Sequence, residues 1–284
     1  MQQYTSNIIG THLIISIDSE KDLTRLFSNI TDRLQHFEFT FSRFLDDNWL
    51  ANVNKKRNWI LDNDGKYMLD FMLKVSQDTQ GYFDPTVWKR LSELGYGPTK
   101  DIISWESSGY HDYRDIKIDG DRVILEGDIE LEFGGAGKGY LIGVLRNMLL
   151  NSQIERFLIN FWWDLYGNKE WKVWLESPFS SDEAIGIYIL QNTYFACSAG
   201  TKRKWWNHHH LINPKTGLSS TEVVASYIEW KSGILVDMYA TTLCVMPWNL
   251  ACITLEETVN IDGVIIRNDG SIFQSKNSDI QLFS

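Results

Sequence analysis

The segment LEFGGAGKGY, residues 131–140, carries four glycines and one lysine and follows an apolar run. Glycine lets backbone N–H groups approach a ligand closely and tolerates positive φ. A strand that leads through such a loop into a helix places those N–H groups at a helix N-terminus, where an anion is stabilised. Lys138 adds a positive charge at the same point. The segment therefore predicts either a site for a phosphate-bearing ligand or a structural turn between a strand and a helix, and its residues alone leave both open.

The loop matches neither common phosphate-binding motif. A P-loop requires Gly-x-x-x-x-Gly-Lys followed by Ser or Thr. Here Gly137-Lys138 is followed by Gly139, and Glu132 stands where the first glycine is required. The dinucleotide motif Gly-x-Gly-x-x-Gly fails as well, because the glycines at 135, 137 and 139 alternate.

Length, composition and charge narrow the class of protein. A chain of 284 residues with 43% hydrophobic residues can bury a large core, either as one domain over residues 1–284 or as two halves that pack intimately. The net charge of −10 disfavours a nucleic-acid-binding protein. No stretch reaches the roughly 18 consecutive apolar residues of a membrane span. The N-terminus has no leader pattern, which predicts a cytoplasmic protein, or an extracytoplasmic one if a leader has been removed.

Hydrophobic periodicity predicts an α+β fold with mixed, largely antiparallel sheets and flanking helices. The expected helices span 18–37, 66–77, 86–94, 139–151 and 236–246. The expected strands span 11–17, 157–159, 171–175, 185–190, 223–230 and 263–266, with another near Ala196. A hairpin over 117–133 is expected to turn at Asp119-Gly120-Asp121. The three cysteines show no metal-ligand spacing and are expected to be buried thiols.

Adjacent tryptophans occur in the segment Asn160-Phe161-Trp162-Trp163-Asp164, which follows a predicted strand. Such side chains either stack on a planar ring or fill the core, and we favour the core. On a strand the two side chains point to opposite faces, so at most one of them would enter a pocket.

Three adjacent histidines, His208 to His210, suggest a metal site, but on a strand only the first and third share a face. Two histidines without a third ligand make a poor zinc site, and a single histidine acting as acid or base is the better interpretation. Asp84 precedes Pro85 and is a good helix N-cap.

Asp237 and Thr241 are spaced i, i+4 and share one face of a predicted helix. A carboxylate beside a hydroxyl suits Mg²⁺, a hard cation that takes oxygen ligands. The alternative is an aspartate that stabilises a helix N-terminus.

Together these segments resemble one family, the FAD:protein FMN transferases, or ApbE-type flavin transferases, over roughly residues 9–256. Residues 81–87 are similar to its Gly-x-Phe-Asp-Pro-Thr-Val segment, and 132–140 resemble Asp-Leu-Gly-Gly-Ile-Ala-Lys-Gly-Tyr. Residues 210–217 resemble His-Ile-Ile-Asp-Pro-Arg-Thr-Gly, and 237–241 match Asp-Ala-Leu-Ala-Thr at its two polar ends.

The resemblance implies an ApbE-like fold and Mg²⁺-dependent transfer of FMN from FAD to a Thr or Ser hydroxyl of a partner flavoprotein, with release of AMP. It implies that Asp237, Thr241 and the Gly137 carbonyl hold the metal, and that Asp237 and His210 are catalytic, with His210 as the candidate base. The FAD contacts that it implies are His210 together with Phe83, Asp84, Gly134, Gly135, Lys138, Asn160, Asp164, Ser198 and Gly200.

The chain departs from the family pattern around this presumed pocket. The family's Asn-x-Gly-Gly-Asp is Asn-Phe-Trp-Trp-Asp here, and two tryptophans in place of two glycines should obstruct close backbone approach to FAD. Ser198-Ala199-Gly200 replaces Thr-Ser-Gly, and Glu132 and Asn213 replace aspartates. Two alternatives therefore stand beside the transferase: an FAD pyrophosphatase that yields FMN and AMP, and a catalytically silent member that binds flavin or nucleotide.

Overall fold

The computed structural model describes residues 1–96, 111–201 and 203–283. Its centre is an eight-stranded sheet with the order β1-β2-β6-β7-β10-β15-β16-β17. Every neighbouring pair in this sheet is antiparallel. The predicted α+β class with largely antiparallel sheets is therefore confirmed. The eight strands are Gln2–Ile8, Thr11–Ile17, Phe157–Phe161, Asp164–Gly167, Thr193–Ala199, Val223–Trp230, Asp262–Arg267 and Ile272–Gln274.

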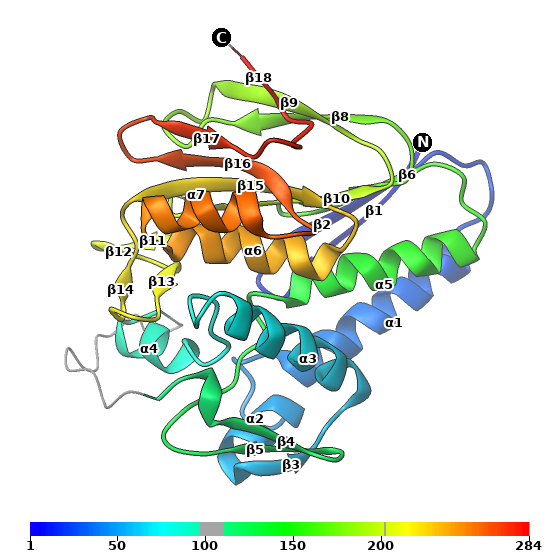
Figure 1. Ribbon diagram of the computed structural model, residues 1–284. Helices are drawn as coiled ribbons and strands as arrows, with labels where there is room; N and C mark the ends of the chain where they lie inside the picture. Colours follow the sequence, from blue (N-terminus) through cyan, green and yellow to red (C-terminus); the bar gives the residue numbers. More distant parts are fainter. Residues whose placement is uncertain (97–110, 202, 284) are drawn as a thin grey trace.

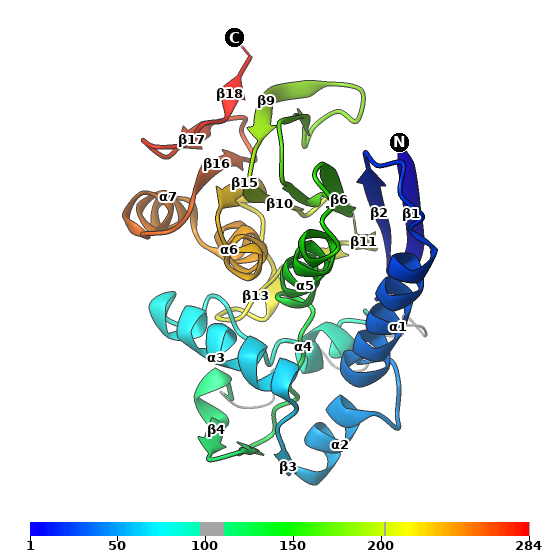
Figure 2. The same ribbon diagram turned by 90° about the vertical axis from the view of Figure 1, so that its right-hand side faces the viewer.

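Helices cover one face of this sheet and a smaller sheet covers the other (Figure 1; Figure 2). The helices are α1 (Thr24–Phe41), α5 (Gly137–Asn151), α6 (Gly233–Val245) and α7 (Trp248–Glu257). The smaller sheet consists of β8 (Trp171–Glu176), β9 (Ala184–Leu190) and β18 (Gln281–Leu282). The largest apolar core lies between helices and sheet, and a second core lies between the two sheets.

A further group of elements lies beyond the helices, away from the central sheet (Figure 1). It contains α2 (Trp49–Lys56), α3 (Asn63–Asp78), α4 (Trp88–Glu93), the 3₁₀ turn Tyr113–Asp115, and a three-stranded sheet of β3 (Asn58–Ile60), β5 (Arg122–Leu125) and β4 (Ile116–Asp119). Two short hairpins pair β11 (Lys204–Trp205) with β12 (His208–His209), and β13 (Ile212–Asn213) with β14 (Leu218–Ser219). Within the described residues, no helix has both the length and the apolar character to cross a bilayer.

The N-terminal segment differs most from the sequence prediction. Strand β1 was not predicted, because its residues alternate between exposed and half-buried and carry few apolar side chains. Ile9 and Gly10 have φ of 46° and 71° and form the two-residue turn between β1 and β2. Helix α1 begins at Thr24 rather than at residue 18 and runs four residues beyond the predicted end at 37, to Phe41. Helices α2 and α7 were not predicted.

Other predictions agree with the structure. The predicted hairpin turns at Gly120, with φ of 61°, between β4 and β5, although its strands are shorter than expected. The three cysteines are free thiols, but the expectation that all three are buried holds for Cys244 alone, because Cys197 and Cys252 are partly exposed.

The helices α5 and α6 approach each other closely at two glycines. A Cβ atom on Gly139 would lie 2.2 Å from the Gly233 carbonyl oxygen, and one on Gly233 would lie 2.5 Å from the Gly139 oxygen. Neither position leaves room for a side chain, because the obstructing atoms belong to the backbone. This contact sets the N-terminus of α5 against the first turns of α6.

We expect Gly139→Ala to lower the free energy of unfolding by about 1–3 kcal/mol, the usual cost of overpacking a close contact. Gly143→Ala is the matched control on the same helix, because its Cβ would meet only the Tyr194 hydroxyl, at 3.9 Å. Removing a helical glycine there should raise stability by roughly 0.5–1 kcal/mol. Urea unfolding of the two variants measures this difference, and equal effects would show that the α5–α6 contact is not close in solution.

Candidate active site

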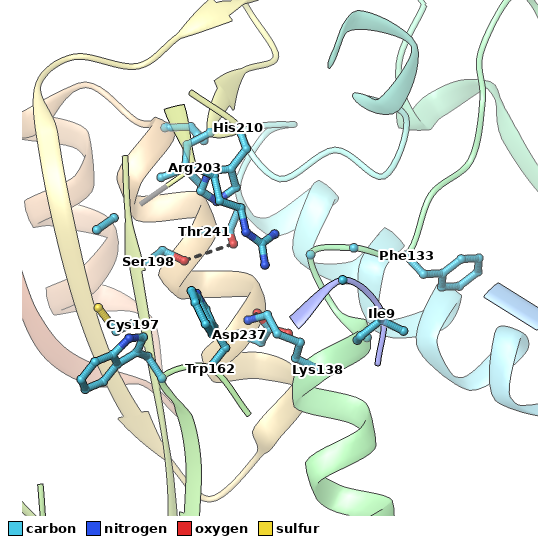
Figure 3. A pocket seen from close by; sticks show the side chains of 18 of the residues that line it. Ile9, Phe133, Lys138, Trp162, Cys197, Ser198, Arg203, His210, Asp237 and Thr241 are labelled. Atoms are coloured by element: carbon cyan, nitrogen blue, oxygen red, sulfur yellow. Dashed lines mark hydrogen bonds and ion pairs between the residues drawn. The ribbon is translucent and has the colours of Figure 1, made fainter. Parts of the chain in front are cut away.

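A cavity of about 230 Å³ opens between the helices and the hairpin turns. Its lining brings together segments that are far apart in the sequence: the β1–β2 turn, the glycine loop, the β6–β7 turn, β10, α6 and the loop after His210. Figure 3 shows the side chains of α5, α6 and β10 that face it. Of the residues implied by the family resemblance, the cavity is lined by Phe83, Asp84, Gly134, Gly135, Gly137, Lys138, Ser198, His210, Asp237 and Thr241.

A buried cluster of one lysine and two aspartates forms the floor of this cavity. Lys138 is the second residue of α5, and its Nζ forms ion pairs with Asp164 Oδ2 and, at 3.2 Å, with Asp237 Oδ1. The second Asp237 oxygen, Oδ2, accepts a hydrogen bond of 2.9 Å from the backbone N–H of Gly139. The sequence left open that Asp237 stabilises the N-terminus of a helix. The structure shows such a contact, but with the N-terminus of α5 and not with that of α6, which carries Asp237.

The cluster has an excess of negative charge. Two carboxylates share one ammonium group, and Asp164 Oδ1 is buried without a hydrogen-bond partner among the described residues. Burial raises the pKa of Asp164, and repulsion from Asp237 raises it further. A second cation would stabilise both carboxylates in their charged forms.

The oxygen donors present fit a hard cation. Thr241 lies one turn after Asp237 on α6 and faces the same cavity. Its Oγ1 is 3.4 Å from the Ser198 hydroxyl on β10 (Figure 3). A carboxylate, a hydroxyl and a backbone carbonyl are the ligand types that Mg²⁺ takes. No group of three or more His, Cys, Asp or Glu side chains in the described parts of the chain is arranged to hold a metal.

The three histidines have different environments. His209 has a structural role: its Nδ1 accepts from the Leu211 N–H at 3.3 Å, so its Nε2 carries the proton and donates to the Ser220 carbonyl at 2.7 Å. His210 lines the cavity, and its Nδ1 is buried without a hydrogen-bond partner among the described residues. Burial and the nearby charge of Arg203 hold the pKa of His210 well below 6.5, so its imidazole is neutral at pH 7.

Arg203 is a cavity residue that was not predicted to be part of the site. Figure 3 shows its side chain extending into the cavity from the segment that also carries His210. The Arg203 guanidinium forms no ion pair or hydrogen bond with residues 1–96, 111–201 or 203–283. Lys138 is balanced by two carboxylates, whereas the positive charge of Arg203 is not compensated by any described residue. The run Lys202-Arg203-Lys204 in an acidic chain was the available signal.

The glycine loop is held in place by Glu132. Its Oε2 accepts from the Gly134 N–H at 2.7 Å and from Arg43 Nη1 at 2.6 Å. The Arg43 guanidinium also lies over the Trp88 ring, 4.5 Å from its centre. None of the glycines at 134, 135, 137 and 139 has positive φ. Their role is close packing, as at Gly135, where a Cβ would lie 3.0 Å from the Phe83 ring.

Three of the expected residues do not line the cavity. The amide oxygen of Asn160 accepts from the Trp163 N–H at 3.3 Å, and Gly200 is buried beneath the His209 ring. Asp164 contacts the site through its ion pair with Lys138. Asp84 lines the cavity but is not a helix N-cap: its Oδ1 accepts from the N–H and the hydroxyl of Thr86, and α4 begins later, at Trp88. Burial raises the pKa of Asp84 to about 6.

The two tryptophans differ from prediction in both conformation and location. Phe161 pairs with Asp164, so Trp162 and Trp163 are the two loop residues of the β6–β7 hairpin, with φ of 53° and 72°. Positive φ at both positions characterises a type I′ turn, which favours Asn and Gly. The tryptophans are 44% and 37% exposed and both line the cavity, so the prediction that they fill the core is wrong. A left-handed conformation costs a non-glycine residue roughly 1–2 kcal/mol.

Comparison with known proteins places this arrangement in a family. Two curated relatives from Klebsiella pneumoniae (strain 342) are named FAD:protein FMN transferase. One is 26% identical over 167 residues, which cover 55% of this chain and 49% of that protein. The other is 21% identical over 260 residues, covering 78% of this chain and 74% of the relative. The first alignment thus spans about half the length of its relative.

Solved structures share the fold. The ApbE protein from Thermotoga maritima aligns with a TM-score of 0.87 at 19% identity, over 97% of both chains. The apo form of the flavinyl transferase ApbE from Pseudomonas stutzeri aligns with a TM-score of 0.84 at 18% identity, over 97% of this chain and 94% of that one. The model of the ApbE family matches residues 9–265, most of the sequence and every segment of the cavity. The chain therefore belongs to the ApbE family.

Proposed function

We propose that this protein is a Mg²⁺-dependent transferase that moves FMN from FAD to a Thr or Ser hydroxyl of a partner flavoprotein and releases AMP. The observation that carries the proposal is the buried Lys138–Asp164–Asp237 cluster, whose Lys138 and Asp237 line the same cavity as Arg203 and the neutral His210. Family membership and the names of the relatives support the choice of FAD as substrate.

The proposed ligands of the metal are Asp237, Thr241 and the Gly137 carbonyl. Mg²⁺, when bound, neutralises charge on phosphoryl oxygens and helps to orient them. Asp164 Oδ1 has no hydrogen-bond partner among the described residues, and two carboxylates share one lysine; both observations support a site that accepts an additional cation. Lys138 holds the two carboxylates in position, because its ammonium group pairs with both of them.

The remaining chemistry falls to side chains of this chain. In the proposed transfer, the acceptor hydroxyl oxygen bonds to the phosphorus of the FMN half, and the bond from that phosphorus to the oxygen bridging it to AMP breaks. AMP leaves with that oxygen, and the hydroxyl proton passes to a base. His210 is suited to take the proton, because burial keeps its imidazole neutral. Arg203 is suited to bind the pyrophosphate, because its guanidinium has no partner among the described residues.

The central test is to incubate the protein with FAD and Mg²⁺, with and without an acceptor flavoprotein or a Ser/Thr-containing acceptor peptide. We expect AMP release only with acceptor, together with covalent flavin fluorescence on the acceptor. AMP and FMN release without acceptor would instead identify an FAD pyrophosphatase. FAD binding without any AMP would identify a silent member and contradict the proposal.

Asp237→Asn should reduce AMP release by at least about 100-fold, a loss typical of removing a group that stabilises charge at a reacting centre. The fold should persist, because the amide oxygen of asparagine can still accept from the Gly139 N–H. Asp269→Asn, at an exposed aspartate in the β16–β17 turn, is the matched control and should keep full activity. Full turnover by Asp237→Asn at low Mg²⁺ would rule out the metal assignment.

The neutral state of His210 predicts a pH effect on stability. Its pKa is lower in the folded protein than in the unfolded chain, so the unfolded state binds more protons as the pH falls below about 6.5, and folding loses stability there. His210→Gln should therefore lose less stability between pH 7.5 and pH 5.5 than the natural protein in urea unfolding. His36→Gln, at an exposed histidine of α1, serves as control. Equal pH dependence in the His210 variant and the natural protein would contradict a buried neutral imidazole.

A further inference from the structure

The β6–β7 turn places two large aromatic side chains where the backbone favours glycine. Both loop residues of this type I′ turn require positive φ, which Asn-Gly and Gly-Gly adopt most readily. The family pattern that this chain resembles has Gly-Gly at these positions. The hairpin therefore does not need tryptophan for its own formation.

The two tryptophans lie outside the apolar cores of the described residues. Trp162 and Trp163 are 44% and 37% exposed. Neither stacks on another aromatic ring, and neither indole N–H donates a hydrogen bond, within the part of the chain that the structure describes. Residues held in unfavourable backbone conformations cluster at binding sites, and these two also line a cavity.

The rings face the cavity that holds the charged groups. Both tryptophans line it together with Lys138, Arg203 and His210. Figure 3 shows Trp162 on the strand side of the cavity, with Lys138 and Asp237 on the helix side. An aromatic surface beside a guanidinium is a combination that binds a planar base and its phosphate together.

We propose that Trp162 and Trp163 form a stacking wall for a planar ring of the flavin nucleotide, either the isoalloxazine or the adenine. In this arrangement the planar ring contacts aromatic side chains, where a glycine turn would offer only its backbone. This proposal rests on the proposed function because it takes FAD as the ligand, but it concerns binding and not transfer. It also reverses the expectation that the tryptophans obstruct FAD, because exposed rings at the side of an open cavity leave the cavity accessible.

The test compares FAD binding by the double variant Trp162→Gly/Trp163→Gly with binding by the natural protein, followed by flavin fluorescence. Glycine suits both turn positions, so we expect an unchanged or higher melting temperature. Loss of ring stacking should weaken FAD binding by about tenfold or more. The variant Trp162→Phe/Trp163→Phe should retain most of the affinity, because phenylalanine also stacks.

Trp206→Gly is the matched control. Trp206 also has positive φ, of 47°, in a two-residue hairpin turn and is 63% exposed, but it does not line the cavity. Its replacement should leave FAD affinity unchanged.

Titration with FMN and with ADP by calorimetry then identifies the ring. A loss of affinity for FMN alone assigns the wall to the isoalloxazine, and a loss for ADP alone assigns it to the adenine; either supports the proposal.

Unchanged or tighter FAD binding by the double glycine variant would overturn the proposal. Unfolding of that variant would overturn it too, because it would give the tryptophans a structural role. A protein that binds FAD through these rings but releases no AMP would refute the transferase and leave the stacking wall intact.

Discussion

The close contact between α5 and α6 at Gly139 and Gly233 determines the geometry of the site. Because neither residue has a side chain, the first turn of α5 lies directly against α6. The Gly139 N–H then reaches the carboxylate of Asp237, and the neighbouring Lys138 reaches the same carboxylate from the cavity side. A methyl group at either glycine would separate these partners. The chemistry of the cavity floor therefore depends on a packing constraint between two helices.

The site also collects features that are unfavourable for folding. Two carboxylates and one ammonium group are buried together, and such an arrangement loses hydration that ion pairing only partly offsets. One carboxylate oxygen has no partner among the described residues, and two tryptophans occupy turn positions that favour glycine. The surrounding core, with apolar helices on one face of the sheet and a second sheet on the other, stabilises the fold against these costs. Departures from local preference concentrated in one cavity are the pattern expected of a functional site.

The sequence predicted those parts of the site that depend on local spacing. The glycine loop leads into α5, and Asp237 and Thr241 share a face of α6, because helical periodicity alone places them there. It could not predict the pairing of Lys138 with Asp164, since that contact depends on how a hairpin packs against a helix. Arg203 was missed although it lies in a basic run, because a sequence does not reveal that its guanidinium has no partner among the described residues. The location of the tryptophans was predicted wrongly because the strand pattern around them was continued through residues 162 and 163. These residues form a turn of a type that usually contains glycine.

The most direct test of the account is a crystal structure of the protein with FAD and Mn²⁺, a hard cation whose position anomalous scattering reveals. We predict a metal peak within about 2.0–2.3 Å of an Asp237 oxygen and of the Thr241 hydroxyl, with the FAD pyrophosphate between the metal and Arg203. A metal bound elsewhere, with Asp237 still paired only to Lys138 and the Gly139 N–H, would contradict the assignment of this cavity as the catalytic centre.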